Sequence, residues 1–272
     1  MDRFRHIVWV LSSQAVLFYG AAAGKEPPSG APMALVAAHS HNDYYRSRPL
    51  ADALDRGFAS IEADVFVVDG ELLVGHYTRE LRPERTLEAL YLAPLRKHVA
   101  AHGGRVFAGP ERLTLLVDFK NDGAAAYAAL ATLLAKYDDL VSGLAEGTWR
   151  PRGVDVVVTG DRPVDAIRSD RSRRVGIDGR FNDTPPDAPA DLTPLISENW
   201  RDHFRWRGVG EMPPDEQQRL AELVERAHGQ GRRLRFWGAA DSPAVWTQMR
   251  RAGVDVLGTD NLDALEQFLR RP

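Results

Sequence analysis

From about residue 33 onward, short apolar runs alternate along the chain with longer stretches in which apolar residues recur at helical spacing. The runs predict strands at residues 33–38, 60–68, 113–119, 154–159, 174–177, 194–197, 233–237 and 254–257. The stretches between them predict helices at 49–57, 86–101, 124–137, 164–169, 214–229, 242–252 and 262–269. Strands that alternate with helices indicate a parallel sheet, and eight such repeats favour a sheet that closes on itself. We therefore expect an α/β fold, a single-domain TIM-type (β/α)8 barrel.

One departure from the alternation is expected after the second strand. The dipeptide Asp69-Gly70 is followed by another apolar run at residues 71–75, and this pattern is typical of a β-hairpin. We also expect Pro94 to interrupt the helix at 86–101.

The first 23 residues have the pattern of a secretory signal peptide. Arg3 and Arg5 precede an apolar segment at residues 7–19, and the small residues Ala21-Ala22-Ala23 offer a cleavage site. Residues 24–32 have the composition of a linker, so the barrel is expected to occupy residues 33–272. These features predict a secreted or periplasmic protein.

Composition narrows the classes of function. At 272 residues and 44% hydrophobic, the chain can form one large domain with a buried core. The net charge of −3 and the lack of a basic stripe give no reason to expect a nucleic-acid partner, and nothing indicates a protein partner. The chain has no cysteine, which excludes disulfides, thiolate metal sites and a cysteine nucleophile.

Polar side chains gather at the ends of the first predicted strands. Glu62 and Asp64 are two residues apart on the second strand, so both point to the same side of the sheet. Two carboxylates on one face repel each other unless a cation lies between them, and a divalent ion is the simplest candidate. Other candidate functional side chains lie at the end of a strand or just after it, as barrel geometry requires of catalytic groups: His39, His41, His76, Asp118, Lys120, Asp178, Glu198, Asn199, Trp237 and Asp260.

These motifs together resemble the superfamily of glycerophosphodiester phosphodiesterases, phosphatidylinositol-specific phospholipase C and sphingomyelinase D toxins. The matching segments are Leu-Val-Ala-Ala-His ending at 39, Ser-Ile-Glu-Ala-Asp-Val at 60–65, Val-Gly-His at 74–76, Leu-Val-Asp-Phe-Lys at 116–120 and Val-Asp-Val-Leu-Gly-Thr-Asp at 254–260. Within the superfamily, His-Ser-His-Asn-Asp-Tyr together with Val-Gly-His resembles the phosphodiesterase-like branch that includes altered inheritance of mitochondria protein 6.

The resemblance implies roles for particular residues. Glu62, Asp64 and Asp118 would bind one divalent cation, Mg²⁺ or Ca²⁺, because such ions prefer oxygen ligands. The general acid and base would be His39 and His76, since imidazole titrates near neutral pH. For the substrate, Lys120 would face the phosphate, Trp237 would line the mouth of the barrel, and His41 would be a further substrate-binding residue.

The resemblance also has limits that bear on the substrate. The His-Arg-Gly and Pro-Glu-Asn-Thr motifs usual in glycerophosphodiesterases are absent, and the third metal position is Asp118, as in the toxin branch. We therefore expect a phosphodiesterase that acts on a lipid-derived or other small phosphodiester, by hydrolysis or by forming a cyclic phosphate, with transient contact with a membrane surface.

Two other functions remain open from the sequence. The His39-Ser40-His41 motif also resembles the start of metal-dependent amidohydrolases, in which case His41 could take the role given to His39, although His39 is favoured because it follows the strand directly. A secreted barrel that binds a phosphorylated ligand without turnover is the other alternative.

Overall fold

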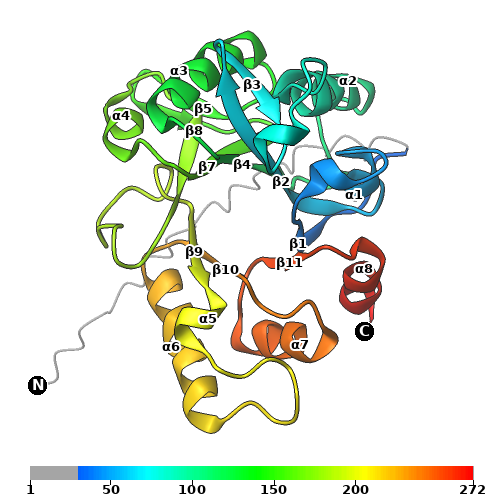
Figure 1. The fold of residues 1–272 in the computed structure, drawn as a ribbon, viewed down its shortest axis with the longest axis vertical. Helices are drawn as coiled ribbons and strands as arrows, with labels where there is room; N and C mark the ends of the chain where they lie inside the picture. The colour runs from blue at the N-terminus through cyan, green and yellow to red at the C-terminus, as the bar shows by residue number, and fades with distance from the viewer. Residues whose placement is uncertain (1–29, 272) are drawn as a thin grey trace, which may run out of the picture.

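The computed structural model describes residues 30–271 and contains an eight-stranded parallel barrel ringed by helices (Figure 1). The barrel strands are β1 (Leu35–Ser40), β2 (Phe58–Val68), β4 (Leu113–Phe119), β7 (Val154–Gly160), β8 (Val175–Gly179), β9 (Leu195–Asn199), β10 (Arg233–Trp237) and β11 (Leu257–Thr259). Their order around the sheet is β10, β9, β8, β7, β4, β2, β1 and β11. The predicted fold class is therefore confirmed.

The barrel closes weakly between β10 and β11. A single parallel bridge joins Arg235 to Val256, and the Val256 amide donates to the Leu234 carbonyl at 3.2 Å. Every other neighbouring pair of barrel strands is joined at two or more positions. The weakest junction of the barrel thus lies between β10 and the last strand, β11.

The helices that cover the barrel follow the strands in sequence. They are α1 (Ala51–Asp55), α2 (Ala93–Ala101), α3 (Gly123–Leu134), α4 (Val164–Ser169), α5 (Trp200–His203), α6 (Pro214–Gly229), α7 (Pro243–Ala252) and α8 (Leu262–Arg270). Short helical turns lie at η1 (Asp43–Tyr45), η2 (Thr78–Glu80), η3 (Glu88–Leu92) and η4 (Ala135–Tyr137). Most of the core lies between this ring of helices and the outer face of the sheet.

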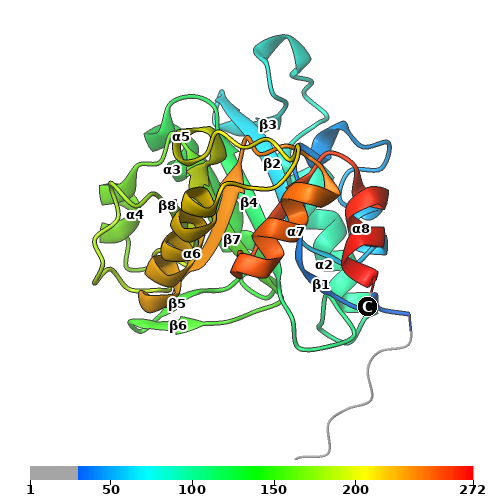
Figure 2. The same ribbon diagram turned by 90° about the horizontal axis from the view of Figure 1, so that it is seen from below.

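Two hairpins lie at opposite ends of the barrel (Figure 2). The predicted one is present: β3 (Glu71–Val74) pairs antiparallel with the end of β2. The segment that follows β3, including η2, extends beyond the barrel at the top of Figure 2. The second hairpin, formed by β5 (Gly143–Ala145) and β6 (Thr148–Arg150), was not predicted.

The barrel interior is layered, because alternate residues of each strand point inward. A small apolar layer, separate from the main core, consists of Leu116, Val157, Leu195 and Val256. Inward-facing residues nearer the carboxyl ends of the strands are mostly polar, and they include Glu62, Asp64 and Asp118. The apolar layer therefore forms the floor of a polar chamber at the end of the barrel where catalytic groups are expected.

Two local predictions differ in detail from the structure. The helix predicted at 86–101 is irregular just before Pro94: the π-helical turn η3 ends at Leu92, and α2 begins at Ala93 with Pro94 in its first turn, where the missing N–H is not needed. The last strand begins at Leu257, three residues later than predicted, because residues 254–256 reach β10 through one bridge only.

The N-terminal prediction lies outside the described residues. Nothing in residues 30–271 bears on a signal peptide or on residues 24–29 of the linker, so the secreted or periplasmic location stays a prediction. Within residues 30–271, the structure has no helix that is both long and apolar enough to span a membrane.

Gly57 joins α1 to β2 in a conformation that a side chain would not tolerate. Its φ is +83°, and a Cβ there would lie 2.0 Å from the Met33 carbonyl oxygen. Gly57→Ala should therefore lower the free energy of unfolding by at least about 2 kcal/mol, measured by urea denaturation. Gly70→Ala is the matched control, because Gly70 has a φ of +82° with nothing within 4 Å of a Cβ, so it incurs the backbone strain alone. Equal losses in the two variants would contradict the steric account.

Candidate active site

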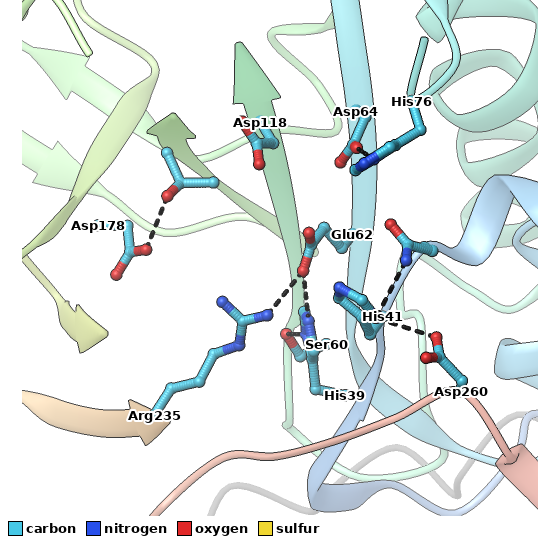
Figure 3. A network of polar contacts seen from close by, with 12 residues as sticks. His39, His41, Ser60, Glu62, Asp64, His76, Asp118, Asp178, Arg235 and Asp260 are labelled. Carbon is cyan, nitrogen blue, oxygen red and sulfur yellow. Dashed lines mark hydrogen bonds and ion pairs between the residues drawn. The ribbon is translucent and has the colours of Figure 1, made fainter. Parts of the chain in front are cut away.

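The three acids predicted to bind a metal lie together in the polar chamber. Ligand atoms of Glu62, Asp64 and Asp118 are all within 4.8 Å of one another. Strand register explains the meeting: Asp64 on β2 is paired directly with Asp118 on β4, and Glu62 lies one inward position below Asp64. Figure 3 shows the three carboxyl groups in one chamber.

Glu62 is held through one of its two oxygens. Its Oε2 atom accepts hydrogen bonds from His39 Nε2 at 2.9 Å and from Arg235 Nη2 at 2.7 Å. Burial opposes ionisation of this side chain, but Arg235 and then His39 outweigh burial, so the pKa of Glu62 lies below its usual value. The Oε1 atom accepts no hydrogen bond from any described residue and stays free for another ligand.

The two carboxylate oxygens of Asp64 also differ in their contacts. Its Oδ2 atom meets three donors: Tyr44 Oη at 2.8 Å, His76 Nδ1 at 2.7 Å and Lys120 Nζ at 2.7 Å. Its Oδ1 atom is buried and has no hydrogen-bond partner among the described residues. An unpaired carboxylate oxygen at full burial is costly, so a partner for this atom is expected.

The pKa of Asp118 is set by burial and by the neighbouring charges. Burial, together with the charges of Asp64 and Glu62, raises the pKa of Asp118 to about 6 against the lowering effect of Lys120. Lys120 Nζ lies 2.9 Å from Asp118 Oδ2, so this lysine bridges the two aspartates. Its predicted contact with phosphate stays a prediction.

This donor set fits a hard divalent cation. It supplies three carboxylates from two adjacent strands, with the free oxygens Glu62 Oε1 and Asp64 Oδ1 inside a rigid wall of sheet. No histidine belongs to the cluster in the part of the chain that the structure describes. Oxygen ligands alone suit Mg²⁺ or Ca²⁺ better than Zn²⁺.

Two histidines near the cluster each have one nitrogen held by a carboxylate. His76 Nδ1 lies 2.7 Å from Asp64 Oδ2, and His41 Nδ1 lies 2.9 Å from Asp260 Oδ1. A carboxylate accepts, so Nδ1 is the donor in each ring, and in the neutral form of the ring Nε2 carries the lone pair. Both rings are partly exposed, with 36% of the His76 side chain and 37% of the His41 side chain accessible.

The environment of His41 favours its charged form. Burial lowers the pKa of His41, but the hydrogen bond to Asp260 and the charge of Glu62 outweigh burial and raise the pKa above its usual value. His41 is also placed by its backbone, since its amide donates to the Thr259 carbonyl at 3.1 Å. The ring therefore stands at the junction of β1 and β11, beside Glu62 (Figure 3).

His39 occupies a different environment. It is fully buried, with Nδ1 2.7 Å from Ser60 Oγ and Nε2 2.9 Å from Glu62 Oε2, so both ring nitrogens are engaged. Burial and then Arg235 lower the pKa of His39 to about 4. A neutral imidazole in this position orients Glu62.

Trp237 stands at the end of β10 with 43% of its surface exposed. It lines a cavity of about 200 Å³ that also contains His41, Arg235 and Asp260 in its wall. The cavity is bounded by β10, β11 and α7, so it opens beside the His41 ring. The position of Trp237 at the mouth agrees with its predicted contact with the organic part of a substrate, which stays a prediction.

Sequence reasoning assigned no role to Tyr44 or Arg235. Tyr44 Oη bridges Asp64 Oδ2 and Asn42 Oδ1, at 2.8 and 2.7 Å. Arg235 could have been found from its spacing, because it stands two residues before Trp237 on a strand and so shares its inward direction. Tyr44 gave no comparable signal, since it lies in a turn.

Comparison with known proteins places this chain in a family. Residues 31–178 match the AIM6-like phosphodiesterase domain, and residues 233–263 match the glycerophosphoryl diester phosphodiesterase family. A solved glycerophosphodiester phosphodiesterase from Agrobacterium tumefaciens has a TM-score of 0.50 and 15% sequence identity, and the match covers 86% of this chain and 99% of that one. That likeness supports the barrel fold.

Three similar proteins are named altered inheritance of mitochondria protein 6 or its homolog. The chain is 30% identical to the protein of Lachancea thermotolerans over 83% of this chain and 63% of that protein. It is 31% identical to the Eremothecium gossypii protein, over 86% and 69% of the two chains. The Arthroderma benhamiae homolog is 26% identical, over 85% and 82%. The chain thus spans less than two thirds of the Lachancea protein. The family match over more than half the chain and these relatives show that the protein belongs to the AIM6-like phosphodiesterase domain family, within the superfamily of glycerophosphodiester phosphodiesterases and phospholipase C-like enzymes.

Proposed function

We propose that this protein is a cation-dependent phosphodiesterase in which His41 and His76 act as the acid/base pair. The observation that carries the proposal is the arrangement of two carboxylate-held imidazoles beside a cluster of three carboxylates in one chamber. Family membership supports phosphodiester hydrolysis as the class of reaction. The cation, the histidine pair and the substrate are our own inference.

Glu62, Asp64 and Asp118 would hold the cation, using the free oxygens described above. When bound, a divalent ion would neutralise charge on the non-bridging oxygens of the phosphate and orient the group. The protein contributes fixed ligands: Glu62 is held by His39 and Arg235, and Asp64 by Tyr44.

His41 is a better candidate than His39 for one half of the pair. A general base needs a free nitrogen within reach of the substrate and a pKa near the working pH. His41 meets these needs, because its Nε2 is unengaged, its ring lines the cavity and its pKa is raised. His39 has no free nitrogen and a pKa of about 4, which suits a positioning group.

The reaction then needs two proton transfers. One imidazole removes the proton of the attacking oxygen through Nε2 as that oxygen forms its bond to phosphorus. The other imidazole, protonated, gives its proton to the leaving oxygen as the second phosphorus–oxygen bond breaks. Asp260 and Asp64 stabilise whichever imidazolium forms. Attack by water gives a monoester, and attack by a neighbouring hydroxyl of the substrate gives a cyclic phosphate.

The substrate we propose is a lipid-derived or other small phosphodiester. The cavity beside His41 has polar and apolar walls, including Trp237 and Phe236, and its volume of about 200 Å³ suits a small alcohol group. Transient contact with a membrane surface would accompany a lipid substrate. The exposed side chains of Tyr45 and Tyr77 support such contact.

The amidohydrolase alternative has no supporting observation. That chemistry needs histidine ligands from later strands, and the two later histidines pair elsewhere: His203 with Glu198 and His228 with Asp255. The alternative of binding without turnover is tested by the assays below.

Cation binding should stabilise the protein against heat. Saturating Mg²⁺ or Ca²⁺, at about 100 times the dissociation constant, should add about 2.7 kcal/mol to the free energy of unfolding, seen as a higher melting temperature that chelator reverses. Asp118→Asn should abolish the increase. Asp178→Asn, a buried acid that faces the interior from β8 outside the cluster, should retain it. A wild-type melting temperature that no cation changes would refute the metal site.

The two acid/base candidates can be separated with bis-p-nitrophenyl phosphate as substrate. His41→Ala and His76→Ala should each lower kcat by roughly 10²- to 10⁴-fold and keep the cation-dependent increase in melting temperature. His39→Ala should instead lower the free energy of unfolding by roughly 1–3 kcal/mol, because it leaves buried groups of Ser60 and Glu62 without their partner. An active His41→Ala enzyme beside a folded, cation-binding but inactive His39→Ala enzyme would return the role to His39.

A further inference from the structure

Arg235 is a buried cation with unused hydrogen-bonding capacity. It points into the barrel from β10 with 5% of its surface exposed. Its Nη2 atom donates to Glu62 Oε2 at 2.7 Å, and its Nε atom is buried without a partner among the described residues. A guanidinium has five N–H donors in a planar fork, so one ion pair leaves most of them available.

The guanidinium lies between the carboxylate cluster and the cavity. Arg235 contacts Glu62 on one side and lines the cavity that contains His41 and Trp237 on the other. Figure 3 shows its side chain pointing across the chamber toward Glu62. A phosphodiester held at the cluster with its alcohol group in that cavity would therefore pass this arginine.

The position of Arg235 complements that of Lys120. Around the closed barrel, β10 is four strands from β4 in either direction, so the two strands face each other. Lys120 directly follows β4 and contacts Asp64 and Asp118, whereas Arg235 contacts Glu62. The cluster is therefore flanked by one cationic side chain on each side.

Once a divalent cation is bound, the charges of the cluster and of its two cationic neighbours also favour an anion. Three carboxylates and two cationic side chains leave the cluster with one net negative charge, which would repel a phosphodiester. A bound divalent cation changes this to one net positive charge, equal and opposite to that of a phosphodiester. Without Arg235 this set of groups would be neutral. Arg235 therefore contributes a positive charge that helps the loaded cluster to attract an anionic substrate.

We propose that Arg235 is a substrate-binding residue that donates to a non-bridging phosphate oxygen, across the barrel from Lys120. The inference rests on the proposed phosphodiesterase function and names a group that binds its substrate. The fork of the guanidinium suits this role, because one nitrogen stays on Glu62 while others reach the phosphate.

The competing explanation is that Arg235 serves only to neutralise Glu62. The two explanations predict different effects of Arg235→Gln. Loss of a phosphate-binding cation weakens anion binding, and loss of a positive charge beside Glu62 leaves cation binding unchanged or strengthens it. A purely structural arginine would leave anion affinity unchanged once the cation site is saturated.

The test uses dimethyl phosphate, a monoanionic diester that hydrolyses very slowly, titrated by phosphorus NMR at saturating Mg²⁺. Arg235→Gln should weaken its binding roughly 10- to 100-fold, the loss expected for one charged hydrogen bond. Mg²⁺ affinity, measured by calorimetry, should be equal or higher. Arg233→Gln is the matched control: Arg233 is the preceding inward arginine of β10 and bonds Thr114 Oγ1, below the apolar layer. It should change neither affinity.

Arg235→Lys keeps the test decisive if the glutamine variant fails to fold, because it keeps the buried charge and loses the fork. It should weaken dimethyl phosphate binding several-fold. Wild-type affinity in either folded variant, or a wild-type protein that binds no dimethyl phosphate in the presence of Mg²⁺, would overturn the proposal. If wild type binds the probe through Arg235 yet hydrolyses no phosphodiester, the proposed function fails and the binding role of Arg235 stands.

Discussion

The structure depends on how the charges of two carboxylates on one strand are compensated inside a barrel. Glu62 and Asp64 face the interior at 5% and 0% exposure, where an uncompensated charge costs several kcal/mol. Compensation comes from strands all around the barrel: His39 from β1, Arg235 from β10, and Lys120 after β4. Each of these groups occupies one carboxylate oxygen and leaves the other free. The contacts that compensate the buried acids thus leave one oxygen of each free, and we propose that a divalent cation binds there.

The same arrangement accounts for the different roles that we propose for the three histidines. His39 lies within the sheet and uses both nitrogens to hold Glu62 and Ser60, so it belongs to the support of the ligands. His41 lies just beyond the strand, where Asp260 contacts its Nδ1 atom and where its ring lines the cavity. His76 receives the equivalent support from Asp64. In the mechanism that we propose, His39 is therefore a positioning group, and His41, two residues later, transfers protons.

Much of this was predictable from sequence because barrel geometry is strict. The alternation of strands with helices predicted the fold. The E-x-D spacing, with Asp118 near the end of the third strand, predicted the cluster, since strand period and register bring Glu62, Asp64 and Asp118 together. The choice between His39 and His41 could not be made from sequence, because it depends on which ring nitrogens are engaged across strands. Arg235 was missed for a similar reason: its partner Glu62 is 173 residues away, and only closure of the barrel brings them into contact.

A crystal structure of the protein soaked with Mn²⁺, which replaces Mg²⁺ in oxygen-ligand sites and has a strong anomalous signal, tests the central claim most directly. The account predicts one anomalous peak in the chamber, within about 2.3 Å of oxygens of Glu62, Asp64 and Asp118, with Lys120 moved away from the two aspartates. No peak at the cluster, with Lys120 still bridging Asp64 and Asp118, would contradict it.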